Sequence, residues 1–218
     1  MQKEVMLLTG AGQIGMAIAR RMGYGMKIVV GDKRIENAQA VADTMNRAGF
    51  DVLPVEMDLS SRTSILKLID TAQQYGEIAM LVNAAGVSPS QASVETILKV
   101  DLYGTAVLLE EVGKVIRQGG TGVTVSSQSG HRLPALGAET DELLACTPTE
   151  RLLELDVLQP QQIRDTLHAY QLAKRCNVKR VMSEAVKWGR RGARINSISP
   201  GIILSLIHIS EPTRPISI

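Results

Sequence analysis

Val5-Met-Leu-Leu-Thr-Gly-Ala-Gly-Gln-Ile-Gly15 is the stretch that decides the fold, because an apolar run leads directly into three spaced glycines. Gly10, Gly12 and Gly15 form G-x-G-x-x-G between a β-rich run and an amphipathic one. Glycine permits a tight turn, close approach of the backbone to a phosphate, and close packing of a helix whose N-terminus favours negative charge. The stretch therefore predicts a strand–turn–helix that binds the pyrophosphate of a dinucleotide. The residues expected to take part are Thr9, Gly10, Gly12, Gln13, Ile14 and Gly15.

Short β-rich runs alternate with longer amphipathic runs along the rest of the chain. Strands are expected at Val5–Thr9, Lys27–Asp32, Asp51–Met57, Met80–Asn83, Gly122–Ser126 and Arg194–Ile198. Helices are expected at Ile14–Met22, Ile35–Ala48, Arg62–Tyr75, Val94–Ile116 and around Leu167–Trp188. Strands that alternate with helices of this length indicate βαβ units, and hence a parallel sheet with helices on both faces. Ligand-binding residues then belong at the carboxyl ends of the strands, where Asp32, Asp58, Asn83 and Ser127 fall.

Composition favours one soluble domain and argues against several other classes of protein. The 218 residues suffice for one α/β domain with a sizeable core, and a net charge of +2 gives no reason to expect nucleic acid or a membrane as partner. The charged N-terminal residues do not resemble a signal peptide, and no apolar run reaches the roughly 18 residues of a membrane span. Cys146 and Cys176 lack the spacing of a metal site or a disulfide framework. We therefore expect a cytoplasmic protein without a metal.

Asp32 lies 22 residues after Gly10, at the end of the second expected strand. A carboxylate there would accept hydrogen bonds from the adenosine ribose hydroxyls and would repel a 2′-phosphate, which favours NAD over NADP. Lys33 and Arg34 follow directly, and either could neutralise a phosphate, so NADP remains possible. The alternative interpretation is that Asp32 is a solvated turn residue.

Tyr170 and Lys174 are one helical turn apart in Tyr-Gln-Leu-Ala-Lys and therefore lie on the same helix face. A free phenol, with a pKa near 10, is a poor base at neutral pH, but a nearby ammonium group stabilises the phenolate. Tyr170 would then donate a proton during reduction of a carbonyl and accept one during oxidation of an alcohol. Alone, this spacing is typical of any amphipathic helix. After the glycine turn, it indicates a nicotinamide-dependent oxidoreductase.

Six motifs in this order resemble the short-chain dehydrogenase/reductase family over residues 1–203. They are the glycine turn, Asp58-Leu-Ser60, Asn83-Ala-Ala-Gly86, Ser126-Ser127, Tyr170-x-x-x-Lys174 and Asn196-Ser-Ile-Ser-Pro-Gly201. The resemblance implies a Rossmann-like, doubly wound parallel α/β sheet, a small alcohol or ketone substrate, and a homo-oligomer. It implies that Ser127 binds the substrate oxygen, with Ser126 as the alternative, and that Lys174 also binds the nicotinamide ribose. The other implied cofactor contacts are Asp58 and Leu59 at the adenine, Asn83, Ala84, Ala85 and Gly86 along the wall, and Pro200 and Gly201 at the nicotinamide.

Three features depart from the family's pattern. The glycine turn is one residue shorter than the usual Thr-Gly-x-x-x-Gly-x-Gly. Asp101 stands where the family has a proton-relay asparagine, and we count it among the catalytic candidates. Ser127 and Tyr170 are 43 positions apart, where the family has about a dozen. We interpret residues 131–162 as a helical insertion, with a capping box at Thr147-Pro-Thr-Glu150, that either covers the substrate pocket or is a peripheral addition.

Residues 204–218 do not fit this pattern. Leu204-Ser-Leu-Ile-His-Ile-Ser-Glu-Pro-Thr-Arg214 reverse-translates naturally to the end sequence of a common transposon-based sequencing adapter. Our hypothesis is that the natural reading frame departs near Ile203, so that the family domain is C-terminally truncated here. We expect the chain as printed to be poorly soluble or inactive, although the parent enzyme works. Recovery of this peptide from an independent genomic clone would refute the hypothesis.

The sequence thus predicts an NAD(P)-dependent oxidoreductase in which Ser127, Tyr170, Lys174 and Asp101 are the catalytic candidates. Two other interpretations remain open. The first is a catalytically silent nucleotide-binding sensor on the same fold, which would bind NAD without turnover and would not depend on the Tyr170 hydroxyl. The second is a fragment that has no function of its own.

Overall fold

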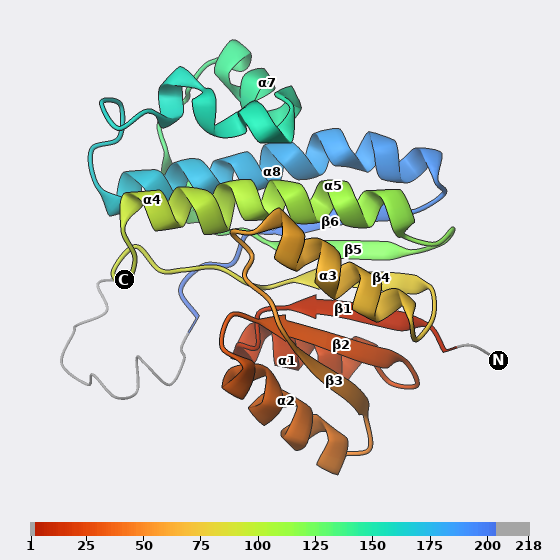
Figure 1. Ribbon diagram of the computed structural model, residues 1–218. Helices are drawn as coiled ribbons and strands as arrows, with labels where there is room; N and C mark the ends of the chain where they lie inside the picture. The colour runs from red at the N-terminus through yellow and green to blue at the C-terminus, as the bar shows by residue number, and fades with distance from the viewer. Residues whose placement is uncertain (1–2, 204–218) are drawn as a thin grey trace.

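The computed structural model describes residues 3–203, which form a six-stranded parallel sheet (Figure 1). The expected adapter-like tail at 204–218 lies outside the described residues. The strands are β1 Val5–Thr9, β2 Lys27–Asp32, β3 Asp51–Glu56, β4 Ile78–Asn83, β5 Thr121–Val125 and β6 Arg194–Ile198, in the order β3-β2-β1-β4-β5-β6. The order reverses between β1 and β4, and such a switch point leaves a crevice for ligands at the carboxyl ends of the strands. The predicted Rossmann-like α/β fold is confirmed.

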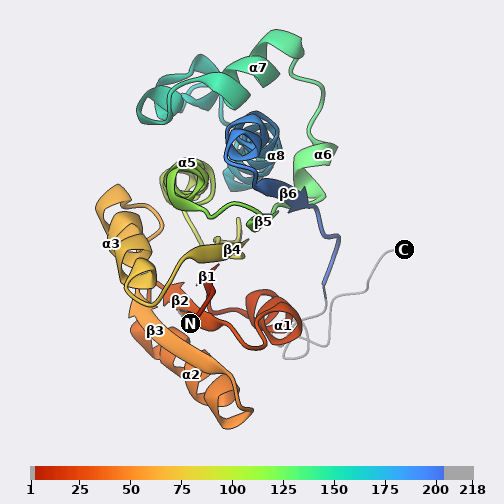
Figure 2. The ribbon, with the colours of Figure 1, turned by 90° about the vertical axis from the view of Figure 1, so that its right-hand side faces the viewer.

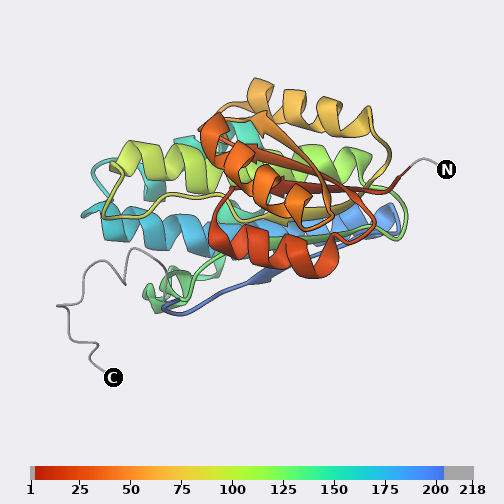
Figure 3. The same cartoon turned by 90° about the horizontal axis from the view of Figure 1, so that it is seen from below.

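Helices cover both faces of the sheet, as predicted. One face carries α1 Gln13–Met22 and α2 Ile35–Arg47, and the other carries α3 Arg62–Gln73, α5 Thr105–Val115 and α8 Thr166–Arg190. Figure 2 shows α1 and α3 on opposite sides of the sheet, and Figure 3 views the molecule from the side of α1 and α2. Successive side chains of a strand point to opposite faces, so in β1 Val5 and Leu7 belong to one buried cluster and Met6 and Leu8 to the other. The apolar run that opens the chain is therefore the centre of the core.

The helix predicted at Val94–Ile116 is interrupted, which corrects the sequence-based prediction. It consists of α4 Val94–Ile97, a π-helical segment η1 Leu98–Gly104, and α5. Gly104 packs closely on the loop that follows β3. A Cβ added at Gly104 would lie 2.1 Å from the carbonyl oxygen of Leu59. The wider turn also places Asp101, which is fully buried, against the helix that carries Lys174. Such π-turns occur frequently at functional sites.

Residues 131–162, which we interpret as an insertion, form short helices, as expected, and lie on the outer side of α8 (Figure 1). After the short helix α6 Ser129–Arg132, it contains α7 Ala138–Cys146 and the 3₁₀ segments η2 Thr149–Glu154 and η3 Asp156–Leu158. Leu144, Leu152 and Leu158 are buried in a cluster with residues of α8. The predicted capping box was wrong, because the residue before η2 is Pro148 and no side chain caps the segment. The Thr149 hydroxyl instead donates to Glu110 of α5.

Charged side chains attach the insertion to the rest of the domain. Arg175 of α8 donates two hydrogen bonds to Asp141 of α7, at 2.6 and 2.7 Å, and Lys179 lies 3.1 Å from the same carboxylate. On the other side, Arg62 of α3 donates to Glu150 of η2 at 2.7 Å. The Arg175 guanidinium holds the pKa of Asp141 below its ordinary value. Burial opposes this effect, and Lys179 adds a smaller lowering contribution. These pairs fix α7 and η2 to α8 and α3.

Asp141→Asn is expected to lower the free energy of unfolding at neutral pH by about 1–3 kcal/mol, because it removes a charge-assisted bidentate pair that is mostly buried. A lowered folded-state pKa stabilises the fold above the ordinary carboxyl pKa of about 4, and this stabilisation is lost as the pH falls below that value through the lowered folded-state pKa. The difference between wild type and variant should therefore be constant at neutral pH and shrink as the pH falls below about 4. Urea unfolding at several pH values measures it, and equal stability at neutral pH would contradict the expectation.

Candidate active site

The glycine turn joins β1 to α1 at the switch point of the sheet. Gly10 has φ +87°, and an added Cβ would lie 2.6 Å from the backbone nitrogen of Ala85, so glycine is required there. At Gly15 a Cβ would lie 2.7 Å from the carbonyl oxygen of Gly10, which leaves α1 room to pack closely on β1. At Gly12 a Cβ would meet no heavy atom within 4 Å, because this residue faces an open cleft. Gly10 and Gly15 are thus needed for the close packing of the turn, and Gly12 leaves space for a ligand.

The side chain of Asp32 lies at the end of β2 and faces the glycine turn. Its carboxylate accepts hydrogen bonds from the backbone N–H groups of Ala11 at 2.9 Å and Arg34 at 3.0 Å. It also accepts one from the Asn37 side chain at 3.3 Å. These contacts fix a carboxylate at the edge of the cleft.

Lys33 and Asp58 face each other across the same end of the cleft, with 3.0 Å between Nζ and Oδ2. Partial burial would raise the pKa of Asp58, but hydrogen bonds from Ser60 and the charge of Lys33 outweigh burial and lower this pKa. Asp58 is therefore an anionic acceptor that already has partners. Arg34 lines the cleft as well.

Two adjoining clefts follow the carboxyl ends of the strands. The first, of about 630 Å³, is bounded by the glycine turn, Asp32, Asp58 and Leu59. The second, of about 270 Å³, is lined by Ser127, Tyr170 and Lys174. It also contains Ile14, Pro200 and Gly201. Both clefts share residues 84–87, so the predicted cofactor residues at Ala84, Ala85 and Gly86 lie between them.

Two predicted cofactor residues have buried side chains that point elsewhere. The Thr9 hydroxyl donates to the Asn83 side chain at 2.8 Å, and the Asn83 amide donates to Thr105 at 3.4 Å. Thr9 and Asn83 are almost fully buried and line neither cleft. Their side chains tie the end of β1 to the end of β4 and to α5. These buried side chains support the strand ends on which the glycine turn stands. The residues that follow them in sequence, Gly10 and Ala84, line the cleft.

Tyr170 and Lys174 lie on one face of α8, as predicted, with the Lys174 ammonium 5.3 Å from the centre of the Tyr170 ring. Lys174 is only 5% exposed. Its ammonium donates to the carbonyl oxygen of Val125 at 3.5 Å and lies 3.8 Å from Oδ2 of Asp101. Asp165, which precedes the helix, caps it by accepting from the backbone N–H of His168 at 2.7 Å. The cap and the buried lysine together fix the position of the phenol.

The two serines after β5 have different surroundings. The Ser126 hydroxyl is buried and donates to the backbone carbonyl of Lys174 at 2.7 Å. The Ser127 hydroxyl accepts from the backbone N–H of Ser129 at 3.1 Å, and its proton is free to face the cleft. Both serines line the cleft, but the Ser126 hydroxyl already donates within the domain and holds β5 against α8, whereas the Ser127 hydroxyl donates to no described residue.

Sequence reasoning missed Asn177, which lies one turn beyond Lys174 and is 1% exposed. With its amide oriented to donate, Asn177 bonds the backbone carbonyls of Asp101 at 2.8 Å and Ala173 at 3.1 Å. It thereby fastens the π-turn of η1 to α8. The spacing of residues 170, 174 and 177, which places an amide on the same buried helix face, is the signal that could have found it.

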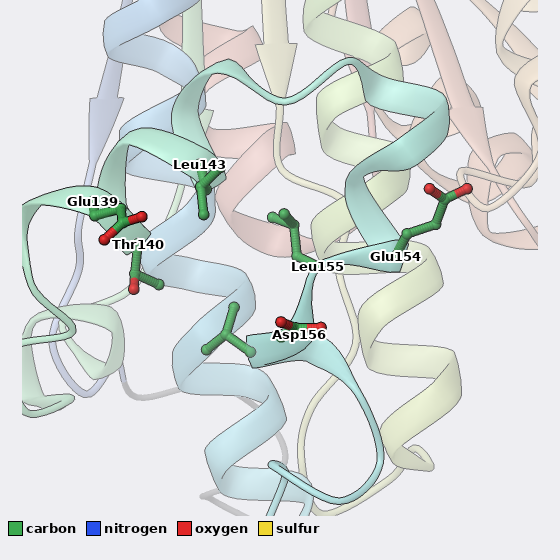
Figure 4. Close-up of a pocket in the computed structure, with 7 residues that line it drawn as sticks. Glu139, Thr140, Leu143, Glu154, Leu155 and Asp156 are labelled. Atoms are coloured by element: carbon green, nitrogen blue, oxygen red, sulfur yellow. The ribbon is translucent and has the colours of Figure 1, made fainter.

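A separate groove of about 350 Å³ lies on the insertion itself (Figure 4). It is lined by acidic and apolar residues of α7 and of the segment from Glu154 to Val157. No residue of 131–162 lines the cleft at Tyr170. The hypothesis that the insertion covers the substrate pocket thus finds no support in the described contacts, which attach it to α8 instead.

Comparison with known proteins agrees with this geometry. The family model described as short chain dehydrogenase matches residues 4–138. A short-chain dehydrogenase/reductase of Alternaria brassicicola, bsc3, is 39% identical over 204 residues, which cover 93% of this chain and 74% of the relative. The chain belongs to the short-chain dehydrogenase family.

Other family members are more distant. Levodione reductase of Leifsonia aquatica is 27% identical, over 92% of this chain and 69% of its own length. A solved double mutant of the Serratia marcescens short-chain dehydrogenase/reductase has a TM-score of 0.71 at 21% identity and covers 94% of this chain and 77% of its own. This last likeness supports the fold alone. Within residues 3–203, no helix is long and apolar enough to cross a membrane, and no cluster of side chains could hold a metal ion.

Proposed function

We propose that this family member binds NAD(H) along the two adjoining clefts and transfers hydride between the nicotinamide and a small alcohol or carbonyl substrate. The observation that carries the proposal is the continuity of the clefts. One holds a glycine turn and a fixed carboxylate, and the other holds Tyr170, Lys174 and Ser127, with residues 84–87 between them. A dinucleotide needs this order of groups, from ribose and phosphate recognition at one end to acid–base chemistry at the other.

The residues present fit a nicotinamide dinucleotide. The open space at Gly12 lies at the N-terminus of α1, where the first backbone N–H groups have no acceptor within the helix and favour a pyrophosphate. Asp32 supplies a fixed acceptor for ribose hydroxyls at the first cleft. Lys174 would hold the ribose at the second cleft, and Pro200 and Gly201 would border the ring. The bound nicotinamide would supply the hydride acceptor or donor.

The chain's own residues would move the proton. Ser127 would donate a hydrogen bond to the substrate oxygen, while the phenol of Tyr170 would donate its proton to that oxygen in reduction or remove it in oxidation. The buried ammonium of Lys174 would stabilise the phenolate form. Asp101 does not line the cleft and would act through Lys174.

Asp32→Ser is expected to raise the NADP-to-NAD ratio of kcat/KM by roughly ten- to hundredfold, because it removes a charged acceptor worth about 1.5–3 kcal/mol per hydrogen bond. Arg34 would then face the 2′-phosphate without the charge of Asp32, while Lys33 would keep its ion pair with Asp58. Steady-state kinetics with both nucleotides measure the ratio. As a matched control, Asp43→Asn, which removes an exposed carboxylate of α2 that lines neither cleft, should leave the ratio unchanged. An unchanged ratio in Asp32→Ser would contradict the assigned role of Asp32.

The experiment that tests the function is a screen of alcohols and ketones with NAD(H) and NADP(H), followed by nicotinamide absorbance. Secondary alcohols and cyclic ketones come first, because relatives include a levodione reductase and a D-threitol dehydrogenase. The screen should be run on the chain as printed and on a chain that continues past Ile203 in the parent frame. Turnover in either supports the proposal, and nucleotide binding without turnover in both would favour the silent sensor. Cell fractionation and light scattering would test the expected cytoplasmic location and homo-oligomer.

A further inference from the structure

Asp101 is a carboxylic acid in a position that water does not reach. The residue is 0% exposed, and its Oδ1 accepts the backbone N–H of Val87 at 2.8 Å. Its Oδ2 has no hydrogen-bond partner and lies 3.8 Å from Nζ of Lys174. Burial raises the pKa of the Asp101 carboxyl above its ordinary value, while the charge of Lys174 and the Val87 N–H oppose the rise. The carboxyl therefore faces the catalytic lysine directly.

The surroundings fix this pair closely. Asn177 holds the backbone carbonyl of Asp101 against α8 at 2.8 Å. A Cβ added at Gly86 would lie 3.1 Å from Oδ1 of Asp101 and 3.4 Å from Nζ of Lys174. The backbone of Gly86, which lines both clefts, therefore packs directly against the two charged groups. Neither side chain can move away from the other without disturbing the π-turn or the wall of the cleft.

We propose that Asp101 is a positioning and tuning residue: in its ionised form, the carboxylate that lies 3.8 Å from Nζ of Lys174 offsets the ammonium and thereby shifts the working range of Tyr170 to higher pH. The inference rests on the proposed function of Tyr170 as the acid–base group. An ammonium stabilises the phenolate by its positive charge, and a carboxylate within ion-pair distance of that ammonium reduces the net field at the phenol. An uncharged amide at the same place would leave the field of Lys174 intact.

Other charged groups near α8 are engaged elsewhere or lie away from the pair. Among the residues that the structure describes, none forms a hydrogen bond or ion pair with the side chains of Tyr170, Lys174 or Asp101 apart from the contacts already given. The buried thiol of Cys176 stays neutral, because burial raises its pKa to about 12. The titratable groups on the elements packed against α8 are Glu95, Lys99, Tyr103, Glu110, Glu111, Lys114, His131, Arg132, Glu139, Asp141, Glu142, Cys146 and Arg194. Those on α8 itself are His168, Arg175, Lys179, Arg180, Glu184, Lys187 and Arg190.

Asp101→Asn tests the proposal, because it removes the charge and keeps an acceptor for the Val87 N–H. The midpoint of the pH–rate profile for alcohol oxidation, which requires the phenolate, should fall by about one pH unit. Asp141→Asn is the matched control, since it removes one carboxylate that pairs with Arg175 and Lys179 of α8 and not with Lys174, and should leave the midpoint where it is in wild type. If Asp101→Asn does not fold, Asp101→Ser removes the same charge and is measured in its place. Equal midpoints in wild type and variant would overturn the proposal.

A second readout does not depend on turnover. The phenolate absorbance of Tyr170 is obtained as the difference between each protein and its Tyr170→Phe counterpart, for wild type and for Asp101→Asn. The phenol of Tyr170 should titrate about one pH unit lower in the Asp101→Asn background. Absence of turnover with every substrate would count against the proposed function, while coincident phenol titrations would count against the role of Asp101. The two failures are therefore distinguishable.

Discussion

Tyr170→Phe should reduce kcat for both oxidation and reduction by about 10³-fold, within the 10²–10⁴-fold range of general acid–base catalysis. The phenol is the proposed acid–base group in the cleft beside Ser127, and the ammonium of the buried Lys174 lies 5.3 Å from the centre of its ring. Phenylalanine keeps the ring and its packing in the cluster formed by α8 and the insertion, so only the hydroxyl is lost. Stopped or continuous assays of nicotinamide absorbance measure the change.

The affinity for NAD should be nearly unchanged in this variant, because the glycine turn and Asp32 lie in the other cleft. Tyr103→Phe is a suitable control. That tyrosine donates only to Glu150 at 3.2 Å, on the outside of η1, and its removal should leave turnover within about twofold of wild type. Full activity of Tyr170→Phe would refute the mechanism, and an equal loss in both variants would point to an indirect effect on the fold.

Gly10→Ala and Gly12→Ala should fail in different ways. At Gly10, a positive φ and a Cβ 2.6 Å from the backbone of Ala85 should lower the free energy of unfolding by about 2–4 kcal/mol. For a domain of this size, that corresponds to a fall in Tm of roughly 10 °C. At Gly12 the Cβ meets no protein atom within 4 Å, so the fold should keep its stability while the methyl group enters the space proposed for the pyrophosphate. The affinity for NAD should then fall about tenfold or more.

Gly25→Ala separates backbone strain from steric overlap, because Gly25 has φ +79° and no heavy atom within 4 Å of an added Cβ. Its loss of stability should be about 1–2 kcal/mol, smaller than that of Gly10→Ala. Thermal unfolding and nucleotide titration of the three variants give the comparison. A Gly12→Ala protein that binds NAD like wild type would contradict the placement of the phosphates at the glycine turn.

The strands were predictable because each short β-rich run is followed by a polar residue at the carboxyl-terminal edge of the sheet. Val5–Thr9, Lys27–Asp32 and Arg194–Ile198 were predicted with the bounds that the structure shows. The glycine turn, Asp32 and the Tyr170–Lys174 pair were recognisable because each depends on local spacing. The structure brings these local motifs to one edge of the sheet.

What the sequence could not predict depends on contacts between distant segments. The π-turn at Asp101 exists because Val87 and Asn177, both far from it in sequence, bond its side chain and backbone. Likewise, Thr147 and Glu150 have the spacing of a capping box, but Glu150 pairs with Arg62 of α3 and leaves the segment uncapped. Local spacing cannot show which of two available partners a side chain takes.

The position of the insertion in the fold likewise depends on contacts between segments that are distant in sequence. Its leucines predicted short helices with an apolar face. Leu144, Leu152 and Leu158 are buried, whereas Leu143 is exposed, and the surface that receives the buried leucines was not evident from sequence. Arg175 of α8 donates to the Asp141 carboxylate. Leu144 packs beside Cys176, whose thiol donates to the Leu144 carbonyl at 3.6 Å. These contacts indicate that the insertion stabilises the helix that carries Tyr170 and Lys174. Substrate profiles measured after deletion of residues 136–159 would decide between this role and a role in covering the substrate pocket.

Calorimetric titration of the protein with NAD and with NADP tests the central claim most directly, because every proposed step requires a dinucleotide in the two adjoining clefts. We expect saturable binding of one nucleotide per chain, tighter for NAD than for NADP, and weaker binding in Gly12→Ala. If the folded protein binds neither nucleotide, the proposed site and the proposed function are both wrong.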